Sequence, residues 1–186
     1  NLPSYEKEDQ ENLATFKKNI LEREGSSNKK PALSTKDDMD EYLKFIKGHE
    51  GKELTAYKPI DTEEHYTIGY GHYGADVKEG QTITEEEAEQ MLIDDINKRL
   101  PKVKAKIKNF DSMPIDVKKN LLGSWFRGSL SGSPTAIRLL NEGKYKEAAD
   151  EFLDNDEYRT TKLGGVKKRM KATANAIRSL QKWLVY

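Results

Sequence analysis

The run HYTIGYGHYG, residues 65–74, stands out in a chain whose other segments follow helical patterns. Its tyrosines, threonine and isoleucine favour strands, and its glycines permit the positive φ of tight turns. From about Leu54 to Ile83 the helical period is absent, so we predict a small antiparallel hairpin sheet there. A second interpretation of the glycines stays open here: a strand edge with little side-chain bulk, against which an extended polymer could lie.

A helix is predicted directly before this sheet. Ser34 or Thr35 can cap its N-terminus, and the helix is expected to end near Gly51. Its apolar side chains recur at positions i, i+3, i+4 and i+7, which are Met39, Tyr42, Leu43 and Ile46. This periodicity predicts that one face of the helix packs on the core.

A long helix is predicted after the sheet. Thr84 and Glu87 have the spacing of a capping box, and Ile83 takes the outer position of a hydrophobic staple. The apolar stripe continues to about Lys108, and Pro101 is expected to kink or split the helix. The stripe consists of Ala88, Met91, Leu92, Ile96, Leu100, Val103 and Ile107.

The remaining chain, residues 109–186, has helical signals only. Pro114 and Pro134 occupy predicted first turns, and Gly143 and the glycine pair 164–165 are predicted to separate helices. The last helix has the stripe Val166, Met170, Ala174, Ile177 and Leu184. The predicted fold class is therefore α+β and mostly helical, with a small β-hairpin sheet lobe and a helical-bundle lobe joined by a long helix.

Composition excludes several classes of protein. The chain has 186 residues and no cysteine, which excludes disulfide frameworks and thiolate metal sites. No apolar run approaches the roughly 18 residues of a membrane span, and we expect no signal peptide at residue 1. The length fits one main domain with an appendage.

Three segments are expected along the chain. Residues 1–24 are predicted to form a charged helical extension, residues 25–36 a linker, and residues 37–186 the main domain. The net charge of zero conceals an asymmetry, because residues 37–100 carry 7 Lys/Arg against 17 Asp/Glu, whereas residues 101–186 carry 18 against 9. We therefore predict an acidic lobe and a basic lobe with different partners.

Carboxylates are the candidates for chemistry. The three histidines, His49, His65 and His72, lack the helical spacing of metal ligands. The chain has no phosphate-cradling loop and no nucleophile elbow, so we expect neither a metal nor a cofactor. The acids around the predicted sheet are Glu50, Glu53, Asp61, Glu63 and Glu64.

Glu50 differs from the other acids because its helix is expected to end at Gly51. The partial negative charge of a helix C-terminus disfavours the anion and so favours the protonated form that a general acid needs. Glycoside hydrolysis uses such an acid and usually a second carboxylate, for which Asp61 is the best-placed candidate. Spacing alone leaves open that both are solvated surface acids, which is what we expect of the other three.

Four short motifs follow one another along the chain: HEG at 49–51, YK at 57–58, YTIGYGH at 66–72 and ITEEEAEQML at 83–92. Together they resemble the phage-type lysozymes of glycoside hydrolase family 24, with the T-even-like lysozyme fold, over about residues 40–184. The resemblance implies that Glu50, Asp61 and Thr67 are catalytic. The Asp-to-Thr interval matches the family pattern, whereas the Glu-to-Asp interval is two residues longer, with residues 59–60 as the apparent insert.

Carried across loops, the resemblance implies substrate contacts at Tyr73, Phe126, Ser133 and Glu151, and Arg127 is a further candidate from its chemistry. Arg127 stands where the family usually has an amide. If it faces the cleft, its guanidinium could pair with a lactyl or peptide carboxylate of the substrate, or with Glu50 or Asp61. The plainer expectation is that Phe126 and Trp125 are core residues and that Ser133 caps a helix.

The resemblance implies an N-acetylmuramidase, which hydrolyses the β-1,4 bond between N-acetylmuramic acid and N-acetylglucosamine in peptidoglycan. Glu50 would be the general acid, and Asp61 and Thr67 would position the attacking water, with inversion at the anomeric carbon. One alternative is a lytic transglycosylase acting on the same bond. Another is a catalytically inactive glycan-binding or structural module of a phage particle.

Bacterial peptidoglycan is the expected partner. Residues 1–36 could also bind other phage structural proteins, which would place the chain in a virion; the expected location is otherwise the host cytoplasm before lysis, with action on the host cell wall or periplasm. Lysine-rich runs at 102–108 and 167–171 could contact phosphates, but their lysines alternate with predicted core positions. We therefore expect solvated helix faces and no nucleic-acid partner.

Overall fold

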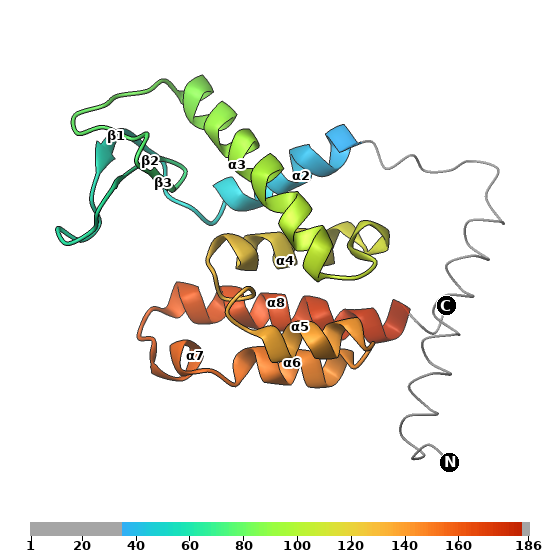
Figure 1. Cartoon of the computed structure of the whole chain (residues 1–186). Coiled ribbons are helices and arrows are strands. Elements are labelled where there is room, and N and C mark those ends of the chain that lie inside the picture. Colours follow the sequence, from blue (N-terminus) through green and yellow to red (C-terminus); the bar gives the residue numbers. More distant parts are fainter. Residues whose placement is uncertain (1–34, 184–186) are drawn as a thin grey trace, which may run out of the picture. The chain divides into compact units, whose positions relative to one another are not determined.

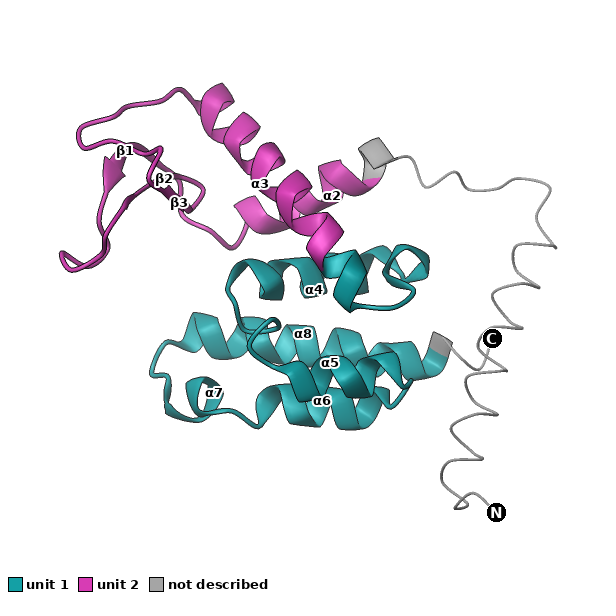
Figure 2. Ribbon diagram, viewed as in Figure 1, with its two compact units in different colours: residues 1–34, 103–186 teal, residues 35–102 magenta. Residues whose placement is uncertain are grey.

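A computed structural model describes residues 35–183 and places the side chains of residues 38–182. The predicted N-terminal helix, nearly all of the linker and Leu184 lie outside the described residues. The chain divides into two compact units, shown in Figure 2. Unit 2 is Thr35–Lys102, and the described part of unit 1 is residues 103–183.

Unit 2 contains a helix, a small sheet and most of a second helix (Figure 1). Helix α2 spans Thr35–Lys47, and helix α3 spans Glu85–Lys106, so α3 continues past the end of the unit. The strands between them are β1 (Glu53–Tyr57), β2 (Tyr66–Gly69) and β3 (His72–Gly74). They form an antiparallel sheet in the order β1-β2-β3, which confirms the predicted hairpin sheet.

The turn between β2 and β3 depends on its glycines. Gly69 has a φ of 64° and Gly71 a φ of 85°, in the left-handed region that favours glycine, so the tight-turn interpretation is confirmed. A Cβ atom built on Gly69 would lie 3.6 Å from Cβ of Ala88 and 3.6 Å from Cδ1 of Ile83. Strand β2 therefore ends in close contact with the beginning of α3.

Helix α3 begins with the predicted capping box. The Thr84 N–H donates to Oε2 of Glu87 at 2.7 Å, and the Glu87 N–H donates to Oγ1 of Thr84 at 3.1 Å. The prediction that Pro101 splits the helix is wrong, because α3 continues through it to Lys106. Proline leaves the carbonyl of Asn97 without its helical donor, but both residues are exposed and water can bind that oxygen.

Unit 1 is built from helices. Its elements after α3 are η1 (Phe110–Ser112), α4 (Ile115–Phe126), α5 (Pro134–Asn141), α6 (Tyr145–Leu153), α7 (Asp156–Thr160) and α8 (Gly164–Trp183). Pro134 begins α5 as predicted, whereas Pro114 lies just before α4. Gly143, with a φ of 78°, turns the chain between α5 and α6. The predicted separator at 164–165 instead forms the first turn of α8.

The core of unit 1 forms where α8 packs against α4 and α6, with α5 against α6 (Figure 1). The predicted stripe of the last helix is buried at its four described positions, Val166, Met170, Ala174 and Ile177. The predicted fold class, mostly helical with a small sheet, is confirmed. Within residues 35–183, no helix is long and apolar enough to cross a membrane.

The capping box makes a prediction about stability. Replacing Thr84 with Ala removes a hydroxyl that satisfies the Glu87 N–H, so we expect a loss of about 1 kcal/mol and a melting temperature lower by about 2–4 °C. Thermal unfolding followed by circular dichroism measures this shift. Glu87→Gln is the control, since glutamine also completes a capping box and should leave the melting temperature nearly unchanged. Equal stability of Thr84→Ala and the parent chain would contradict the prediction.

Candidate active site

Glu50 lies one turn beyond the end of helix α2. The N–H groups of His49 and Glu50 both donate to the Ile46 carbonyl, at 3.0 and 2.8 Å, so the chain closes the last turn before it leaves the helix. Nδ1 of His49 contacts the Phe45 carbonyl at 2.7 Å and occupies another of the helix-end oxygens. These bonds fix the Glu50 backbone, and its side chain is half-buried just beyond the helix, which ends at Lys47 and not near Gly51 as predicted.

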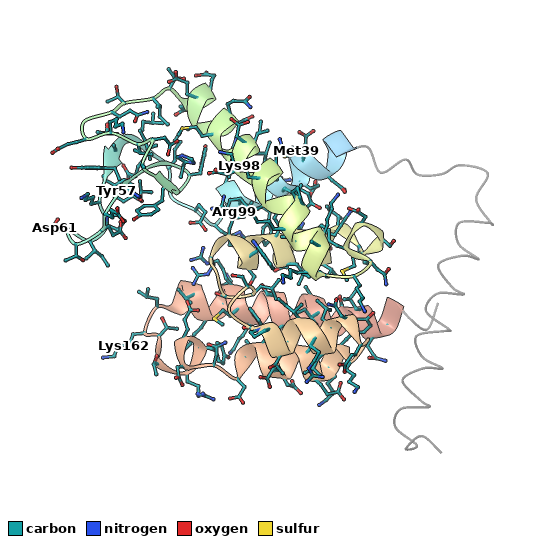
Figure 3. The ribbon with its side chains drawn as sticks, in the orientation of Figure 1. Met39, Tyr57, Asp61, Lys98, Arg99 and Lys162 are labelled. Atoms are coloured by element: carbon teal, nitrogen blue, oxygen red, sulfur yellow. The ribbon has the colours of Figure 1, made fainter. Side chains whose placement is uncertain are left out.

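Asp61 and Thr67 lie on the hairpin that follows. Asp61 is exposed at the far end of the loop joining β1 to β2, as Figure 3 shows. The two residues of the apparent insert, Pro59 and Ile60, are also exposed, so the longer loop extends outward. Thr67 is only 7% exposed in the central strand, with Tyr57 and Tyr73 as its partners in register on either side.

Tyr57, in strand β1, interacts electrostatically with Glu50. Burial raises the pKa of its phenol above the usual value, and the nearby carboxylates of Glu53, Glu63 and Glu50 raise it further. The phenol therefore stays protonated at neutral pH and can donate a hydrogen bond. Because Tyr57 pairs with Thr67 across the sheet, one side chain of β1 lies near both the proposed acid and the strand that carries the proposed water-binding threonine.

Glu63 corrects an expectation from the sequence. It was grouped with the solvated acids, yet it is half-buried, and its Oε2 atom is buried without a hydrogen-bond partner. Its neighbours Asp61 and Glu64 are exposed. A buried oxygen without a donor costs about 1–3 kcal/mol, so this loop contains an acceptor that a ligand or water could satisfy. A pattern of acidic residues could not reveal this, since it carries no information on which one is covered.

His72 fastens the sheet to helix α3. Its Nδ1 atom contacts Oδ2 of Asp95 at 2.8 Å, and its Nε2 atom contacts Oδ2 of Asp76 at 2.9 Å. Asp95 lies in α3 and is 7% exposed, with Arg99 at 3.7 Å on its other oxygen. Burial lowers the pKa of the imidazole, but the hydrogen bonds with Asp95 and Asp76 outweigh it and raise the pKa above its usual value. These contacts indicate a structural role.

Tyr73 is held beside the predicted catalytic strand. Its backbone pairs with Thr67, its hydroxyl accepts a bond from the His65 N–H at 3.3 Å, and its ring lies 5.4 Å from the His65 ring. The side chain is nonetheless 49% exposed. A fixed, exposed aromatic ring is suited to packing against the apolar face of a sugar.

The other predicted substrate contacts are in unit 1. Arg127 directly follows α4 and donates through Nη2 to Oε1 of Glu157 at 3.1 Å, while Ser129 Oγ lies 3.3 Å from the other oxygen of Glu157. The partner of this guanidinium is thus an acid that the sequence analysis did not consider. Nε of Arg127 is buried without a partner.

Two further expectations in unit 1 are tested by the packing. Phe126 and Trp125 are half-buried rather than core residues. Ser133 precedes α5 but does not cap it, because its hydroxyl donates to the Ser129 carbonyl at 2.8 Å. Glu151 is half-buried in α6.

The candidates fall into two sets: Glu50, Asp61, Thr67 and Tyr73 belong to unit 2, and Phe126, Arg127, Ser133 and Glu151 belong to unit 1. Within the described residues, no group of three His, Cys, Asp or Glu side chains could hold a metal.

Comparison with known proteins relates the chain to lysozymes and endolysins. Residues 47–173 match the model of the phage lysozyme family. The endolysin of Bacillus phage PZA is 43% identical over 117 residues, covering 59% of this chain and 43% of the endolysin, so the chain spans less than half of that relative.

Solved structures agree on the fold. The endolysin from Escherichia coli O157:H7 phage FAHEc1 superposes with a TM-score of 0.58 at 28% identity, covering 74% of this chain and 90% of the endolysin. The muramidase domain of SpmX from Asticaccaulis excentricus has a TM-score of 0.59 at 22% identity, covering 73% and 93%.

The contacts of His72 predict how stability changes with pH. A raised folded pKa stabilises the fold fully below the unfolded value of about 6.5, and this contribution is lost as the pH rises through the folded pKa. The hydrogen bond from His72 lowers the pKa of Asp76, so its contribution is present above about 3.9 and is lost as the pH falls through the folded value. We expect the urea-unfolding free energy to fall as the pH rises above the unfolded pKa of about 6.5, and to fall less in His72→Gln. An equal fall in both proteins would contradict this assignment.

The buried oxygen of Glu63 makes a prediction about stability. Glu63→Met keeps the side-chain length and removes the unsatisfied oxygen, so we expect a gain of about 1 kcal/mol in thermal unfolding. Glu64→Met is the matched control, because the Glu64 side chain is 85% exposed one residue further along the loop. The expectation is wrong if Glu63→Met is no more stable than the control.

Proposed function

The chain belongs to the phage lysozyme family, and from this membership we propose that it hydrolyses bacterial peptidoglycan as an N-acetylmuramidase. The bond cut would be the β-1,4 link between N-acetylmuramic acid and N-acetylglucosamine. The observation that carries the proposal is the position of Glu50, held at the C-terminal end of α2 within the same unit as the hairpin that bears Asp61 and Thr67. We place the chain, more finely, in glycoside hydrolase family 24.

Glu50 is the proposed general acid. It would donate its proton to the glycosidic oxygen as the bond to the anomeric carbon breaks, a step that contributes on the order of a hundred- to ten-thousandfold in rate. The protonated phenol of Tyr57 near Glu50 supports the proposal, because it could hydrogen-bond to the carboxylate left after the transfer.

Asp61 and Thr67 are the proposed water-positioning residues. Asp61 would orient or deprotonate the water, or stabilise the positive charge that develops on the sugar, and Thr67 would hold the water from the central strand. The water oxygen forms the new bond to the anomeric carbon from the face opposite the leaving group, which inverts its configuration. The exposed ring of Tyr73, the strand neighbour of Thr67, would pack against a sugar.

The residues of unit 1 are proposed to bind the rest of the substrate. Phe126 offers a half-buried ring, Arg127 a guanidinium for a lactyl or peptide carboxylate, and Ser133 and Glu151 polar groups for hydroxyls or amides. Attachment to a phage particle through residues 1–36 stays a prediction, which mass spectrometry of purified virions would test. The proposed site of action is the host cell wall, after synthesis in the host cytoplasm.

Replacing Glu50 with Gln tests the proposed acid. The amide keeps the shape of the side chain but has no transferable proton, so we expect the digestion rate of purified peptidoglycan to fall at least about a hundredfold while the melting temperature stays nearly unchanged. The matched control is Glu53→Gln, which alters an exposed acid at the start of β1 and should digest at close to the parent rate. A Glu50→Gln variant that still digests the wall would overturn the assignment.

Mass spectra of the products from the same digestion identify the reaction. Hydrolysis leaves reducing muramic acid ends, whereas a lytic transglycosylase closes an anhydro ring and releases ends lighter by one water. We expect reducing ends, because a transglycosylase has no use for a positioned water and the chain retains both Asp61 and Thr67. An intact, folded chain that releases no fragments at all would favour the glycan-binding module instead.

A further inference from the structure

A pocket of about 460 Å³ lies entirely within unit 1. The end of helix α3, the end of α4 and helix α5 form its walls. Its volume lies in the range of about 300–1,000 Å³ that is typical of small-molecule sites. None of the residues proposed for cleavage or for contact with the glycan chain lines it, so the proposed function leaves this pocket without a role.

Both apolar and cationic side chains line the pocket. Trp125 and Ile137 provide apolar surface, and Lys106, Lys108 and Arg138 provide positive charge. The one acid of the lining, Glu142, is already bound, since it accepts from Arg138 at 2.8 Å and lies 3.2 Å from Nζ of Lys144. The pocket therefore presents an excess of positive charge beside an indole ring.

Two of the cations are available to a ligand. Lys106 and Lys108 are exposed, and within residues 38–182 neither forms an ion pair. Nearby lysines differ, because Lys104 is paired with Asp111 at 2.8 Å. Two unpaired ammonium groups separated by one residue repel each other and gain energy when an anion lies between them.

Asn141 fixes the backbone of these two lysines against α5. Its Nδ2 atom donates to the Lys106 carbonyl at 2.8 Å, and its Oδ1 atom accepts from the Lys108 N–H at 2.9 Å. One side chain thus closes both hydrogen bonds around Ile107, which is fully buried. Since the backbone is already ordered, binding does not have to pay for ordering it.

The type of cation indicates the type of anion. A planar carboxylate is bound best by the two-pronged guanidinium of arginine, but Arg138 is already bound to Glu142. Lysines act as point charges, and two of them together suit the several oxygens of a phosphate group. The indole face of Trp125 beside them suits the C–H face of a sugar or polyol.

We propose that this pocket binds a phosphorylated polyol or sugar, with the phosphate between Lys106 and Lys108 and the carbon chain against Trp125. This chemistry occurs both in small phosphate esters and in wall polymers built from polyol phosphates. Binding is separate from cleavage and does not require the glycosidase reaction. In the polymer case, the pocket holds the protein on the wall.

The fluorescence of Trp125 can be used to measure binding to this pocket. The chain has two tryptophans, so Trp183→Phe leaves Trp125 as the single fluorophore. We expect titration with poly(glycerol phosphate) to change its fluorescence saturably, with an affinity that falls as salt rises from about 50 mM to about 200 mM. Free glycerol phosphate in a parallel titration distinguishes the two sources, because a monomer that binds as tightly per phosphate identifies a small-ester site, and preference for the polymer identifies a wall-polymer site. Glycerol, which lacks the charge, should cause no change.

The double variant Lys106→Gln/Lys108→Gln should weaken binding roughly tenfold. Lys168→Gln/Lys171→Gln is the matched control, because it removes the same charge from two exposed lysines of α8 and should leave the affinity within about twofold. Isothermal titration calorimetry on the chain with both tryptophans repeats the comparison without the fluorophore change. Digestion of phosphate-free peptidoglycan should be equal in both double variants, so this result separates the pocket from the proposed cleavage.

Three results would overturn the proposal. One is the absence of saturable binding to either phosphate probe in both assays. Another is equal weakening by the two double variants, which would mean that only the total charge matters. The third is single-stranded DNA of equal phosphate content binding as tightly as the polyol phosphate, which would identify a general polyanion surface.

Discussion

The bonds of His72 to Asp95 and Asp76 hold the small sheet in place, and the proposed active site depends on them. A three-stranded sheet with strands of three to five residues has little core of its own. It is stabilised instead by contact with α3, where Asp95 binds the imidazole and Ala88 lies close to Gly69. Thr67 lies two residues before Gly69 in the chain, and Tyr73 directly follows His72. Both proposed substrate-facing residues therefore lie next to residues that hold the sheet against α3.

The sequence pattern predicted the structural features that depend on residues close together in the chain. The Thr84–Glu87 capping box is formed within one helical turn, and the glycines at 69 and 71 act through their own φ angles. The fold class could therefore be predicted, and so could the helix that precedes Glu50, although it ends three residues earlier than Glu50. For the catalytic residues, the pattern supplied the candidates, and their roles remain proposals.

Features that depend on residues distant in sequence could not be predicted in this way. Arg127 is bound by Glu157, thirty positions along the chain, and nothing in the local pattern marks that acid. The covered oxygen of Glu63 is likewise a property of how the loop folds back. Whether Pro101 splits its helix could not be predicted for another reason: the answer depends on whether solvent reaches the freed carbonyl, and so on the exposure of each helix face.

The number of charged residues in a segment also does not show which of them already form ion pairs. Many acids of residues 37–100 already have partners, such as Glu85 with Lys52 and Glu89 with Lys47. In the basic half, Lys104 and Lys119 are paired with aspartates, whereas Lys106 and Lys108 are not. A segment with excess positive charge therefore acts through a few unpaired side chains, and their position matters more than the total.

Glu157 is a built-in competitor for any anion that approaches Arg127. Because the chain tethers this carboxylate beside the guanidinium, its local concentration does not fall on dilution, whereas that of a free anion does. A small free carboxylate makes no further contacts that could favour its binding to Arg127 over that of Glu157. A carboxylate carried on a polymer that makes further contacts can displace Glu157, since those contacts supply the difference in free energy. If Arg127 contacts substrate as proposed, its own counter-ion would therefore favour a carboxylate carried on a polymer over the same carboxylate free in solution.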